Sequence, residues 1–468
     1  EFIAGVKKEL AAASLRGTQQ LHWFEKPKYE GVFSIWYAKG LGVDRGHEAL
    51  KMGNFEGAAK NGGVLVVAGD DHGGKSSATA HQSEQVLAAA MIPILYPANT
   101  EEILEYGLYG FAMSRFTGLW VSMKGTNDTL EATASVNTDV ENLVVVEPTD
   151  YPKPANSLNI LKEEIFPIPQ EQKLIRFRLP AAQAFARANK LDRVIYDSNR
   201  RTLGIVTAGK AYLDVRQALS DLGITEARAK LLGIRIYKLG MTWPVEPQGL
   251  AEFVNGHSEI LVVEEKRAFI EEQVRSQLYN ETDPAKRPPI TGKLDLQGNM
   301  LIPADGETSP AMLCEVIGKR LDALKVLEGE IADLVTARRN ELVATATVPA
   351  ANIIRTAYFC SGCPHNSSTV VPEGHLAFAG VGCHALAHFM PGRPTAWAAQ
   401  MGAEGTLWIG LHRFTEINHA FQNLGDGTYF HSGSLGIRAS VGAGVNVTYK
   451  LLYNDAIAMT GGQPYDGK

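Results

Sequence analysis

Cysteine is scarce in this sequence, and long apolar runs are missing from it. Four cysteines occur among 468 residues, too few for the disulfide framework that holds many small extracellular domains together. No apolar stretch approaches the roughly 18 residues that span a membrane, and no signal peptide is recognisable. We therefore expect a protein of the reducing cytoplasm that has no membrane partner.

Basic charge is not in excess either. Lysine and arginine total 45 against 51 aspartate and glutamate, so the net charge is −6, and the pI is near 6.1. A main partner made of nucleic acid would need a basic face for its phosphates, so none is expected. The remaining composition, 45% hydrophobic and 21% charged, is ordinary for a globular protein.

Apolar runs of strand length alternate with helical patterns along the chain. The runs at 32–37 and 62–68 precede Gly-rich stretches that we interpret as loops, at 39–46 and 69–77. A helix is expected over 100–116, with Thr100 as its N-cap. The alternation predicts an α/β fold of several doubly wound, mostly parallel sheets.

A second α/β unit begins near residue 174, after a Pro-rich stretch. No GxGxxG stands at its first turn, so dinucleotide binding has no support. Strands are expected at 201–206, 234–239 and 259–263, and the apolar spacing over 311–344 predicts one long helix. The predicted organisation is a domain over 1–150, a linker over 151–173, a domain over 174–290, a loop and helical connector over 291–354, and a domain over 355–468.

The pattern with the most chemical content is Gly425-Asp426-Gly427, followed at a distance by Asn454. Magnesium prefers oxygen ligands and is commonly held by one or two protein groups together with phosphate oxygens. Asp426 offers an anionic oxygen, Asn454 a neutral one, and the main-chain carbonyl of Ala456 a third. Flanking glycines let the backbone approach a diphosphate. This spacing is typical of a magnesium and thiamine diphosphate (TPP) site.

An Asp-Gly turn by itself is ordinary turn chemistry, so the surroundings matter. The expected strand over 445–453 delivers Asn454 to a strand's carboxyl end, where α/β sheets bind ligands. A polar Gly-rich loop follows, and its Thr460 and Gly461 are suited to covering a phosphate. These surroundings favour the cofactor site over a plain turn.

Three of the cysteines are grouped. Cys360 and Cys363 form a C-x2-C pair, and Cys383 follows in the sequence VGCH. The grouping suggests three ligands of a [4Fe–4S] cluster, but zinc completed by His365 or His384 is an alternative. Buried free thiols are a third, and spacing alone leaves all three open.

Long stretches of the chain resemble one family, the fused-subunit bacterial indolepyruvate:ferredoxin oxidoreductases, which belong to the TPP-dependent 2-oxoacid:ferredoxin oxidoreductases. The resemblance covers nearly the whole chain but only the middle of the family's polypeptide. The chain also begins without methionine, so we expect a central piece of a longer protein. The matching stretches are AGDDHGGKSSATAHQSE (68–84), GMTWPVEP (240–247), YFCSGCPHNSS (358–368), GVGCH (380–384), QMGAEG (400–405), NLGDGTYFHSG (423–433) and NVTYKLLYNDAIAMTGGQP (446–464).

The resemblance implies a role for each part of the chain. Residues 1–150 would be a TPP pyrimidine-binding domain, 174–290 a transketolase C-terminal-like domain and 355–468 the diphosphate- and magnesium-binding domain. The loop carrying Asp70, Asp71, His72 and Lys75 would contact substrate or cofactor, although a solvated polar turn is an equal alternative. The implied site residues are Asp426, Asn454 and Ala456 for magnesium; Gly425, Gly427 and Thr428 beside the diphosphate; Cys360, Cys363 and Cys383 for the cluster; and His365 and His384 near the cofactor.

The implied reaction is oxidative decarboxylation of a 2-oxo acid, with indolepyruvate or another arylpyruvate as the expected substrate. Its product would be an acyl-CoA, with CoA as co-substrate, and its electrons would pass through the cluster to ferredoxin. A homodimer is expected, because TPP is usually bound between two facing domains. The alternatives are a non-redox TPP decarboxylase or transketolase-like enzyme, and a catalytically silent scaffold subunit.

One position departs from the family. A glutamate that activates the aminopyrimidine ring lies nine residues before a glycine in an Ala-rich helix start, and counting back from Gly17 reaches Lys8. Glu9 is adjacent, but a shift of one residue turns a helix by about 100°. Three explanations remain open: Glu9 acts through a local bulge, TPP activation is impaired, or the recorded sequence is wrong near this end.

Overall fold

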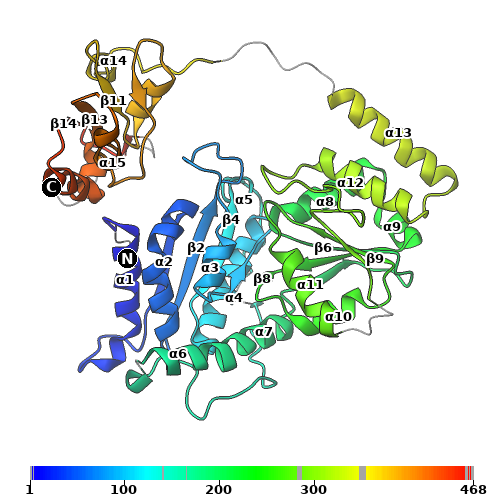
Figure 1. Cartoon of the computed structure of the whole chain (residues 1–468). Helices are drawn as coiled ribbons and strands as arrows, with labels where there is room; N and C mark the ends of the chain where they lie inside the picture. Colours follow the sequence, from blue (N-terminus) through cyan, green and yellow to red (C-terminus); the bar gives the residue numbers. More distant parts are fainter. Residues whose placement is uncertain are drawn as a thin grey trace. The chain divides into compact units, whose positions relative to one another are not determined.

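The computed structural model describes residues 3, 5–139, 142–164, 166–281, 287–346, 355–458, 462 and 464. The chain divides into two compact units, drawn in Figure 1. The larger, Lys8–Val348, is called the core unit, and Pro349–Lys468 with Glu1–Lys7 is called the C-terminal unit. Each is described by itself.

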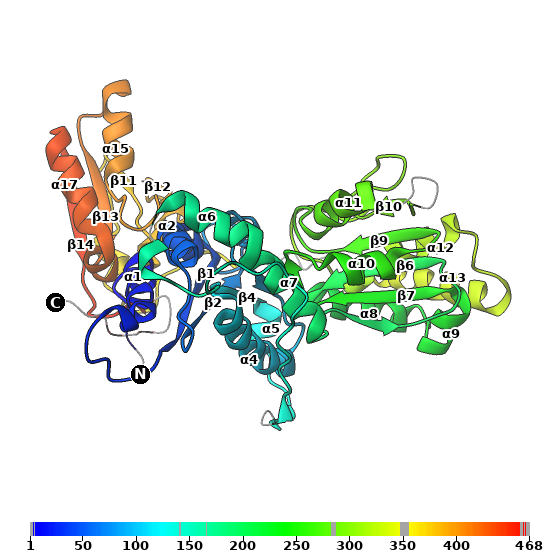
Figure 2. The same cartoon turned by 90° about the horizontal axis from the view of Figure 1, so that it is seen from below.

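The first sheet of the core unit has five strands in the order β1-β2-β4-β3-β8. Its first four strands are parallel, and β8 runs antiparallel to β3. Helices lie on both sides of the sheet (Figure 2), and the inner strands are largely buried, but on edge strand β1 the alternate residues Phe33, Ile35 and Tyr37 are exposed. The strands are β1 (Phe33–Lys39), β2 (Gly63–Asp70), β3 (Ile94–Leu95), β4 (Val121–Thr126) and β8 (Met241–Trp243). The neighbouring helices are α1 (Lys8–Gln19), η1 (Leu21–Trp23), α2 (Gly40–Glu56), α3 (Glu84–Ala89), α4 (Thr100–Thr117), α5 (Asn127–Leu130), η3 (Lys162–Glu164), α6 (Pro167–Lys173), η4 (Leu174–Arg178) and α7 (Leu179–Ala188).

The second sheet of the core unit has the order β10-β9-β6-β7-β5, and only β5 is antiparallel. Its strands are β5 (Arg193–Tyr196), β6 (Leu203–Ala208), β7 (Ile234–Leu239), β9 (Glu259–Val263) and β10 (Ile290–Thr291). Its helices are α8 (Gly209–Asp221), α9 (Glu226–Leu232), α10 (Pro247–Val254), α11 (Ile270–Glu281), α12 (Pro310–Ala323) and α13 (Gly329–Ala346).

The two sheets of the core unit share one hydrophobic core. A single cluster of buried side chains includes Trp36 and Val66 of the first sheet together with Val206 and Ile260 of the second. Strand β8 adds a backbone connection, because it follows the second sheet's β7 in sequence but pairs with β3 of the first. The core unit is therefore one body.

The C-terminal unit has one parallel sheet in the order β12-β11-β13-β14. Its small core is formed by Phe378, Trp408 and Ala420. The strands are β11 (Leu376–Phe378), β12 (Thr395–Ala396), β13 (Ala420–Gly425) and β14 (Val447–Leu452). The helices are α14 (His365–Ser368), η6 (Cys383–Phe389), α15 (Thr406–Leu411), η7 (His412–Phe414), α16 (Asp426–Thr428), η8 (Tyr429–Gly433) and α17 (Ser434–Ala443).

The predicted fold class is confirmed, since the sheets are α/β and mostly parallel. Three local predictions were wrong. The stretch 39–46 is not a loop, because helix α2 begins at Gly40. Asn99 rather than Thr100 caps α4, through a bond from the Glu102 amide to its side chain. The long helix expected over 311–344 is broken into α12 and α13 at Lys325, whose φ of +54° no helix tolerates.

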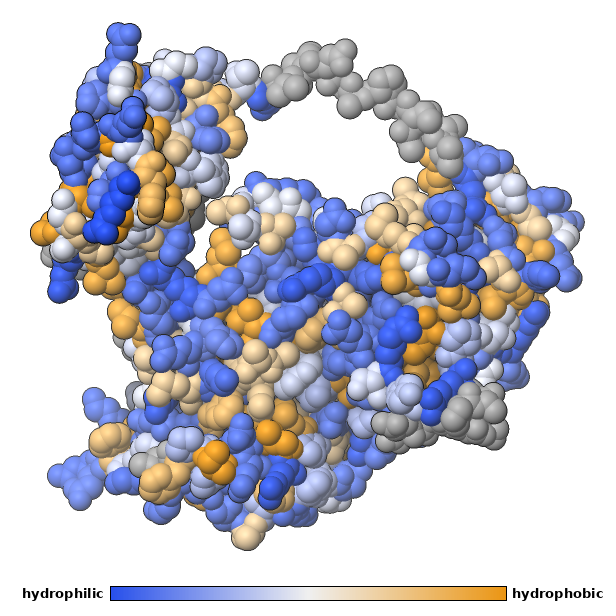
Figure 3. Space-filling view, in the orientation of Figure 1, coloured by the Kyte–Doolittle hydropathy of each residue, from blue (hydrophilic) through white to orange (hydrophobic). Residues whose placement is uncertain are grey.

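The viewed surface in Figure 3 mixes hydrophilic and hydrophobic residues, as folded proteins commonly do. Among the residues that the structure describes, no helix combines the length and the apolar character needed to cross a bilayer. The division into three domains stays a prediction.

Candidate functional site

Two strands of the C-terminal unit end side by side at the GDG sequence. β13 and β14 are parallel, with Gly425 opposite Leu452. Oδ2 of Asp426 accepts hydrogen bonds from the amides of Asn454, at 3.0 Å, and Asp455, at 2.7 Å. Oδ1 accepts from the amide of Gly427 at 2.9 Å. The Asp426 carboxylate thus joins the two sequence patterns that were predicted to act together.

Asp426 also opens a continuous helical segment. It is the first residue of α16, which runs on through η8 into α17. Helix N-termini favour anions, because their first amides have no partners inside the helix. Part of the segment, η8, has π-helical spacing, a distortion that often occurs at functional sites. The position suits a negatively charged group.

The donors at this point suit magnesium. The Asp426 carboxylate, the Asn454 amide oxygen and the Ala456 carbonyl are hard oxygen donors on adjacent loops. Asn454 Oδ1 also accepts from the Ala456 amide at 3.2 Å, which closes this second loop. A Cβ added to Gly427 would lie 3.2 Å from Ile457 Cγ1, so glycine keeps the turn open. The residues present therefore fit a magnesium diphosphate.

The three grouped cysteines occupy one region of the C-terminal unit. Cys360 is exposed, and Cys363 and Cys383 are half-buried. Burial together with the nearby Cys363 and Cys360 raises the pKa of the Cys383 thiol, which places the three sulfur atoms within electrostatic range of one another. Among the described residues, no three His, Cys, Asp or Glu side chains are grouped so that they could hold a metal ion. A cluster bound here would need its cysteines drawn together and a further ligand.

Two histidines connect the thiols to the GDG turn. Nδ1 of His365 lies 3.3 Å from Cys363 Sγ, and its ring stacks parallel to His384 at 6.0 Å. Burial and the neighbouring His365 lower the pKa of His384 to about 4. His384 is therefore neutral near pH 7, so it can hold a hydrogen bond but not a positive charge.

Sequence reasoning missed a buried polar residue in this region. Asn423 on β13 is fully buried, and neither atom of its side-chain amide has a partner in the described part of the chain. Nε2 of the buried His384 is also without a hydrogen bond there. Unpaired buried polar groups are rare and call for an explanation such as a bound molecule. The sequence could have indicated Asn423 by its position, because it is a polar residue two residues before Gly425.

The start of α1 shows how Lys8 and Glu9 lie. Lys8 Cγ would be 3.2 Å from a Cβ on Gly42, so Lys8 packs against α2. Burial and the charge of Arg45 lower the pKa of Lys8. Glu9 Oε2 lies 3.9 Å from Arg45 Nε. Helix α1 is continuous from Lys8 onward, so the structure has no bulge that would turn Glu9 into the position of Lys8.

The polar loop at 71–83 begins where β2 ends, at Asp70. The Asp70 side chain is fully buried and lies 3.4 Å from Lys124 Nζ and 3.1 Å from His81 Nδ1. These partners hold its pKa well below the usual value, against the effect of burial. Asp71 accepts hydrogen bonds from the amides of Lys75 and Ser76. Both carboxylates are thus bound within the protein, which favours a structural turn over direct ligand contact.

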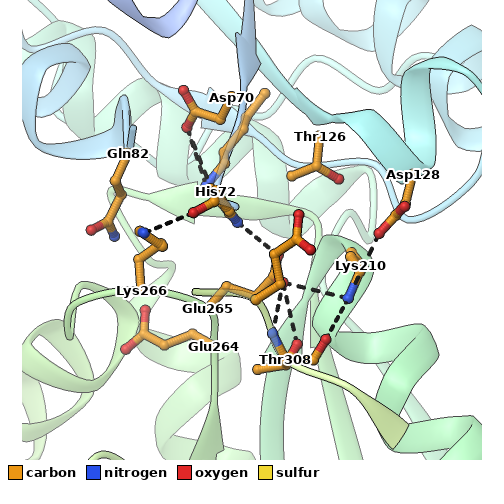
Figure 4. Close-up of polar contacts among 12 residues, drawn as sticks. Asp70, His72, Gln82, Thr126, Asp128, Lys210, Glu264, Glu265, Lys266 and Thr308 are labelled. Carbon is orange, nitrogen blue, oxygen red and sulfur yellow. Dashed lines mark hydrogen bonds and ion pairs between the residues drawn. The ribbon is translucent and has the colours of Figure 1, made fainter. Parts of the chain in front are cut away.

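Charged residues of the second sheet meet this loop (Figure 4). Nδ1 of His72 lies 2.9 Å from Oε2 of Glu265. Glu265 Oε1 accepts from the Thr308 amide and lies 3.4 Å from Lys210 Nζ. Sequence reasoning missed Glu265 and Lys210. The sequence could have indicated them by position, since each follows the carboxyl end of a predicted parallel strand.

Comparisons with known proteins give one consistent answer. A family model described as "Indolepyruvate oxidoreductase domain" matches residues 193–347. The indolepyruvate oxidoreductase subunit IorA of Methanothermobacter marburgensis is 25% identical over 452 residues, which cover 93% of this chain and 66% of the relative. That of Thermococcus kodakarensis is 26% identical over 444 residues, covering 88% and 62%. The chain is similar to the indolepyruvate oxidoreductases over nearly all of its length. It spans about two thirds of the length of these relatives.

A solved 2-oxoglutarate:ferredoxin oxidoreductase from Magnetococcus marinus is similar with a TM-score of 0.45 and 14% identity, covering 69% of this chain and 57% of that one. This similarity is too low to bear on the assignment.

Apart from Glu9 on α1, the predicted site residues fall into three groups. Gly425, Asp426, Gly427, Thr428, Asn454 and Ala456 are brought together at the ends of β13 and β14. The three cysteines, His365 and His384 lie in one neighbouring region. Thr460 and Gly461 lie outside the described residues. Their roles as ligands stay predictions.

Proposed function

We propose that this chain is the TPP-binding part of an oxidoreductase that decarboxylates a 2-oxo acid and passes the electrons to ferredoxin. The observation that carries the proposal is the Asp426 carboxylate, which joins the GDG turn to Asn454 through main-chain bonds. The similarity to indolepyruvate oxidoreductases supports indolepyruvate or another arylpyruvate as substrate, and the family resemblance implies an acyl-CoA as product and CoA as co-substrate. The activity belongs to the whole enzyme, of which this chain is one portion.

Asp426, Asn454 and Ala456 would hold magnesium, and the magnesium would bind the diphosphate of TPP. When bound, TPP supplies an electron sink for the carbon that loses carbon dioxide. The N-terminal amides of α16 would stabilise the negative charge of the diphosphate. Neutral His384, buried beside Gly425, would accept or donate one hydrogen bond and exclude water from the site.

Cys360, Cys363 and Cys383 would supply three ligands of an iron–sulfur cluster. Two observations support this proposal: Cys360 and Cys363 lie close enough to Cys383 to raise its pKa, and Cys363 and Cys383 are half-buried. A one-electron carrier near TPP would accept the electrons of the substrate in two steps. Ferredoxin would then receive them.

A second candidate, a catalytically silent subunit, is favoured by one observation. Lys8 stands where the family has its activating glutamate, and α1 does not turn Glu9 into that place. In this case TPP would bind but would not be activated.

Anaerobic purification followed by assays for iron, sulfide, magnesium and TPP tests the proposal. We expect equal molar amounts of TPP and magnesium, and equal molar amounts of iron and sulfide. The variant Asp426→Asn should weaken magnesium-dependent TPP binding by more than about tenfold, measured by calorimetry. Asp295→Asn is the control, because Asp295 also accepts main-chain bonds in a turn but lies in the core unit. Undiminished TPP binding by Asp426→Asn would contradict the proposal.

A further inference from the structure

The loop over residues 71–83 of the core unit is held by polar groups alone. Its buried side chains are Asp71, His72, His81, Gln82 and Ser83, and none of them is apolar. Hydrophobic burial is non-directional and insensitive to pH, whereas ionic contacts depend on protonation. The position of this loop therefore depends on the charge of its partners.

Two histidines hold the two ends of the loop, and both contact Asp70. At the first end, His72 lies between Glu265, 2.9 Å from Nδ1, and Asp70, 3.8 Å from Nε2. At the other end, His81 lies between Asp70, 3.1 Å from Nδ1, and Asp44, 2.8 Å from Nε2. Each ring nitrogen thus faces a carboxylate, within hydrogen-bond distance at three of them and at 3.8 Å, beyond that distance, at Nε2 of His72. An imidazole bound in this way is favoured in its protonated form.

The other charged groups around His72 do not remove this preference. Burial and then Lys124 of β4 disfavour the imidazolium, but Asp70 and Glu265 outweigh them and raise the pKa of His72. Burial also disfavours the charged form of His81, but Asp70 and Asp44 outweigh it and raise the pKa of His81. The charged contacts around the two histidines and Glu265, called the junction, include three further sets. Glu84 on α3 pairs with Lys124, and Lys266 donates to the His72 carbonyl. Lys210 on α8 pairs with Asp214, Asp128 and Glu265.

Glu265 stays ionised across the working range, because its neighbours lower its pKa to about 2. Asp70 is likewise ionised. Of the side chains that hold the loop, the two histidines change charge near neutral pH. Glu264, whose pKa burial raises to about 7, also titrates there, but its carboxylate accepts hydrogen bonds from the main-chain amides of Phe269, Ile270 and Glu271 at the start of α11. When the histidines lose their protons, buried Asp70 keeps Lys124 but loses two cationic partners, and Glu265 keeps Lys210.

We propose that His72 and His81 are positioning residues that clamp loop 71–83 between the two sheets of the core unit in their protonated form. The loop starts at the carboxyl end of β2, the edge where parallel sheets bind ligands. The clamp therefore fixes the position of loop 71–83 relative to the carboxyl edge of the first sheet. Its effect on substrate binding rests on the proposed function; the clamp itself does not.

The sign of the pH dependence follows from the raised pKa values. A histidine with a raised pKa contributes its full stabilisation below the reference value of about 6.5 and loses it as pH rises through the folded-state pKa. The loop is therefore held most firmly at pH 6 and loosens toward pH 9. Each unit by which a pKa is raised corresponds to about a tenfold change in the clamping equilibrium.

Hydrogen exchange of the whole chain, read by mass spectrometry from pH 6 to 9 and corrected for intrinsic exchange rates, tests the clamp. We expect protection of 71–83 to fall by about tenfold or more, while β6 (Leu203–Ala208) stays constant. Unchanged protection of the loop over this range in the unmodified protein would overturn the proposal, whatever the variants do.

The variants His72→Gln and His81→Gln should lower loop protection at pH 6 and flatten its pH dependence. His257→Gln is the matched control, since His257 is also buried in the core unit but has its pKa lowered to about 4 by burial. It is therefore neutral throughout, and its replacement should leave the loop's pH response intact. Loss of the response in His257→Gln as well would overturn the assignment. If His72→Gln fails to fold, Glu265→Gln removes the same contact.

Steady-state kinetics address the positioning role. We expect His72→Gln to raise KM for the 2-oxo acid at pH 6 more than it lowers kcat, with little difference from the unmodified enzyme at pH 9. Altered exchange with unchanged KM would show that the clamp does not position substrate. An enzyme that binds no TPP would fail the proposed function, but the exchange result would stand.

Discussion

Lys8, near the start of the chain, stands where the family resemblance places an activating glutamate. Lys8 begins α1, packs against α2 and has its pKa lowered by burial and by Arg45. A carboxylate at this place would instead be stabilised by Arg45. Asp70 shows the opposite case, a buried carboxylate whose partners are all supplied by the protein. The same side-chain chemistry thus serves structure at one place and, by resemblance, catalysis at the other.

The variant Lys8→Glu is expected to raise the TPP-dependent rate by about a hundredfold or more, the usual contribution of a positioned acid or base. The rate is measured as substrate-dependent dye reduction with saturating TPP and magnesium. Lys7→Glu changes the charge equally at the neighbouring position and serves as control. Equal rates in Lys8→Glu and the unmodified protein would show that Lys8 does not limit activation.

Helix α2 shows how packing decides the structure of an element. Its first turns contain Gly40 and Gly42, residues that usually favour loops. A Cβ on Gly40 would lie 2.7 Å from Asp70 Oδ1 and would also meet the His81 ring. A Cβ on Gly42 would lie 2.6 Å from that of Ala38. Glycine is required at both positions because the start of α2 packs closely against Ala38 of β1, Asp70 of β2 and His81 of the loop.

Opposite effects are therefore expected from the same substitution in two helices. Gly40→Ala should lower the free energy of unfolding by about 1–3 kcal/mol, because the methyl group overpacks a buried ionic site. Gly107→Ala in α4 should raise it by about 0.5–1 kcal/mol, since no atom outside the neighbouring backbone of the helix lies within 4 Å of the added Cβ. Urea denaturation followed by circular dichroism measures both. Stabilisation by Gly40→Ala would contradict the close approach.

At the scale of the whole molecule, the core unit joins two sheets that the sequence presents as separate domains. They share a hydrophobic cluster, strand β8 and the charged junction around Glu265. We therefore expect a substitution that destabilises one sheet to destabilise the other as well. The loop clamped by His72 and His81 depends on both.

Ile260→Ala tests this coupling. Ile260 is fully buried on β9, so its truncation should cost about 3 kcal/mol. Native-state hydrogen exchange should show lower protection in β2 of the first sheet as well as in β6 of the second. Leu231→Ala, at a side chain that is 67% exposed, should change stability by less than about 0.5 kcal/mol. Unchanged protection of β2 in Ile260→Ala would mean that the sheets unfold independently.

The sequence by itself determined the fold class, several strand positions and the pairing of Asp426 with Asn454. β7 and β9 match their predicted bounds, 234–239 and 259–263. β9, EILVV, is the nearly continuous apolar run that a buried parallel strand shows. Only the tertiary structure decided that α2 begins at Gly40, that β8 joins the first sheet, and that His72 meets Glu265. The physical reason is the separation in sequence. Hydrophobic periodicity and turns are set by neighbouring residues, whereas these contacts join residues far apart in the chain.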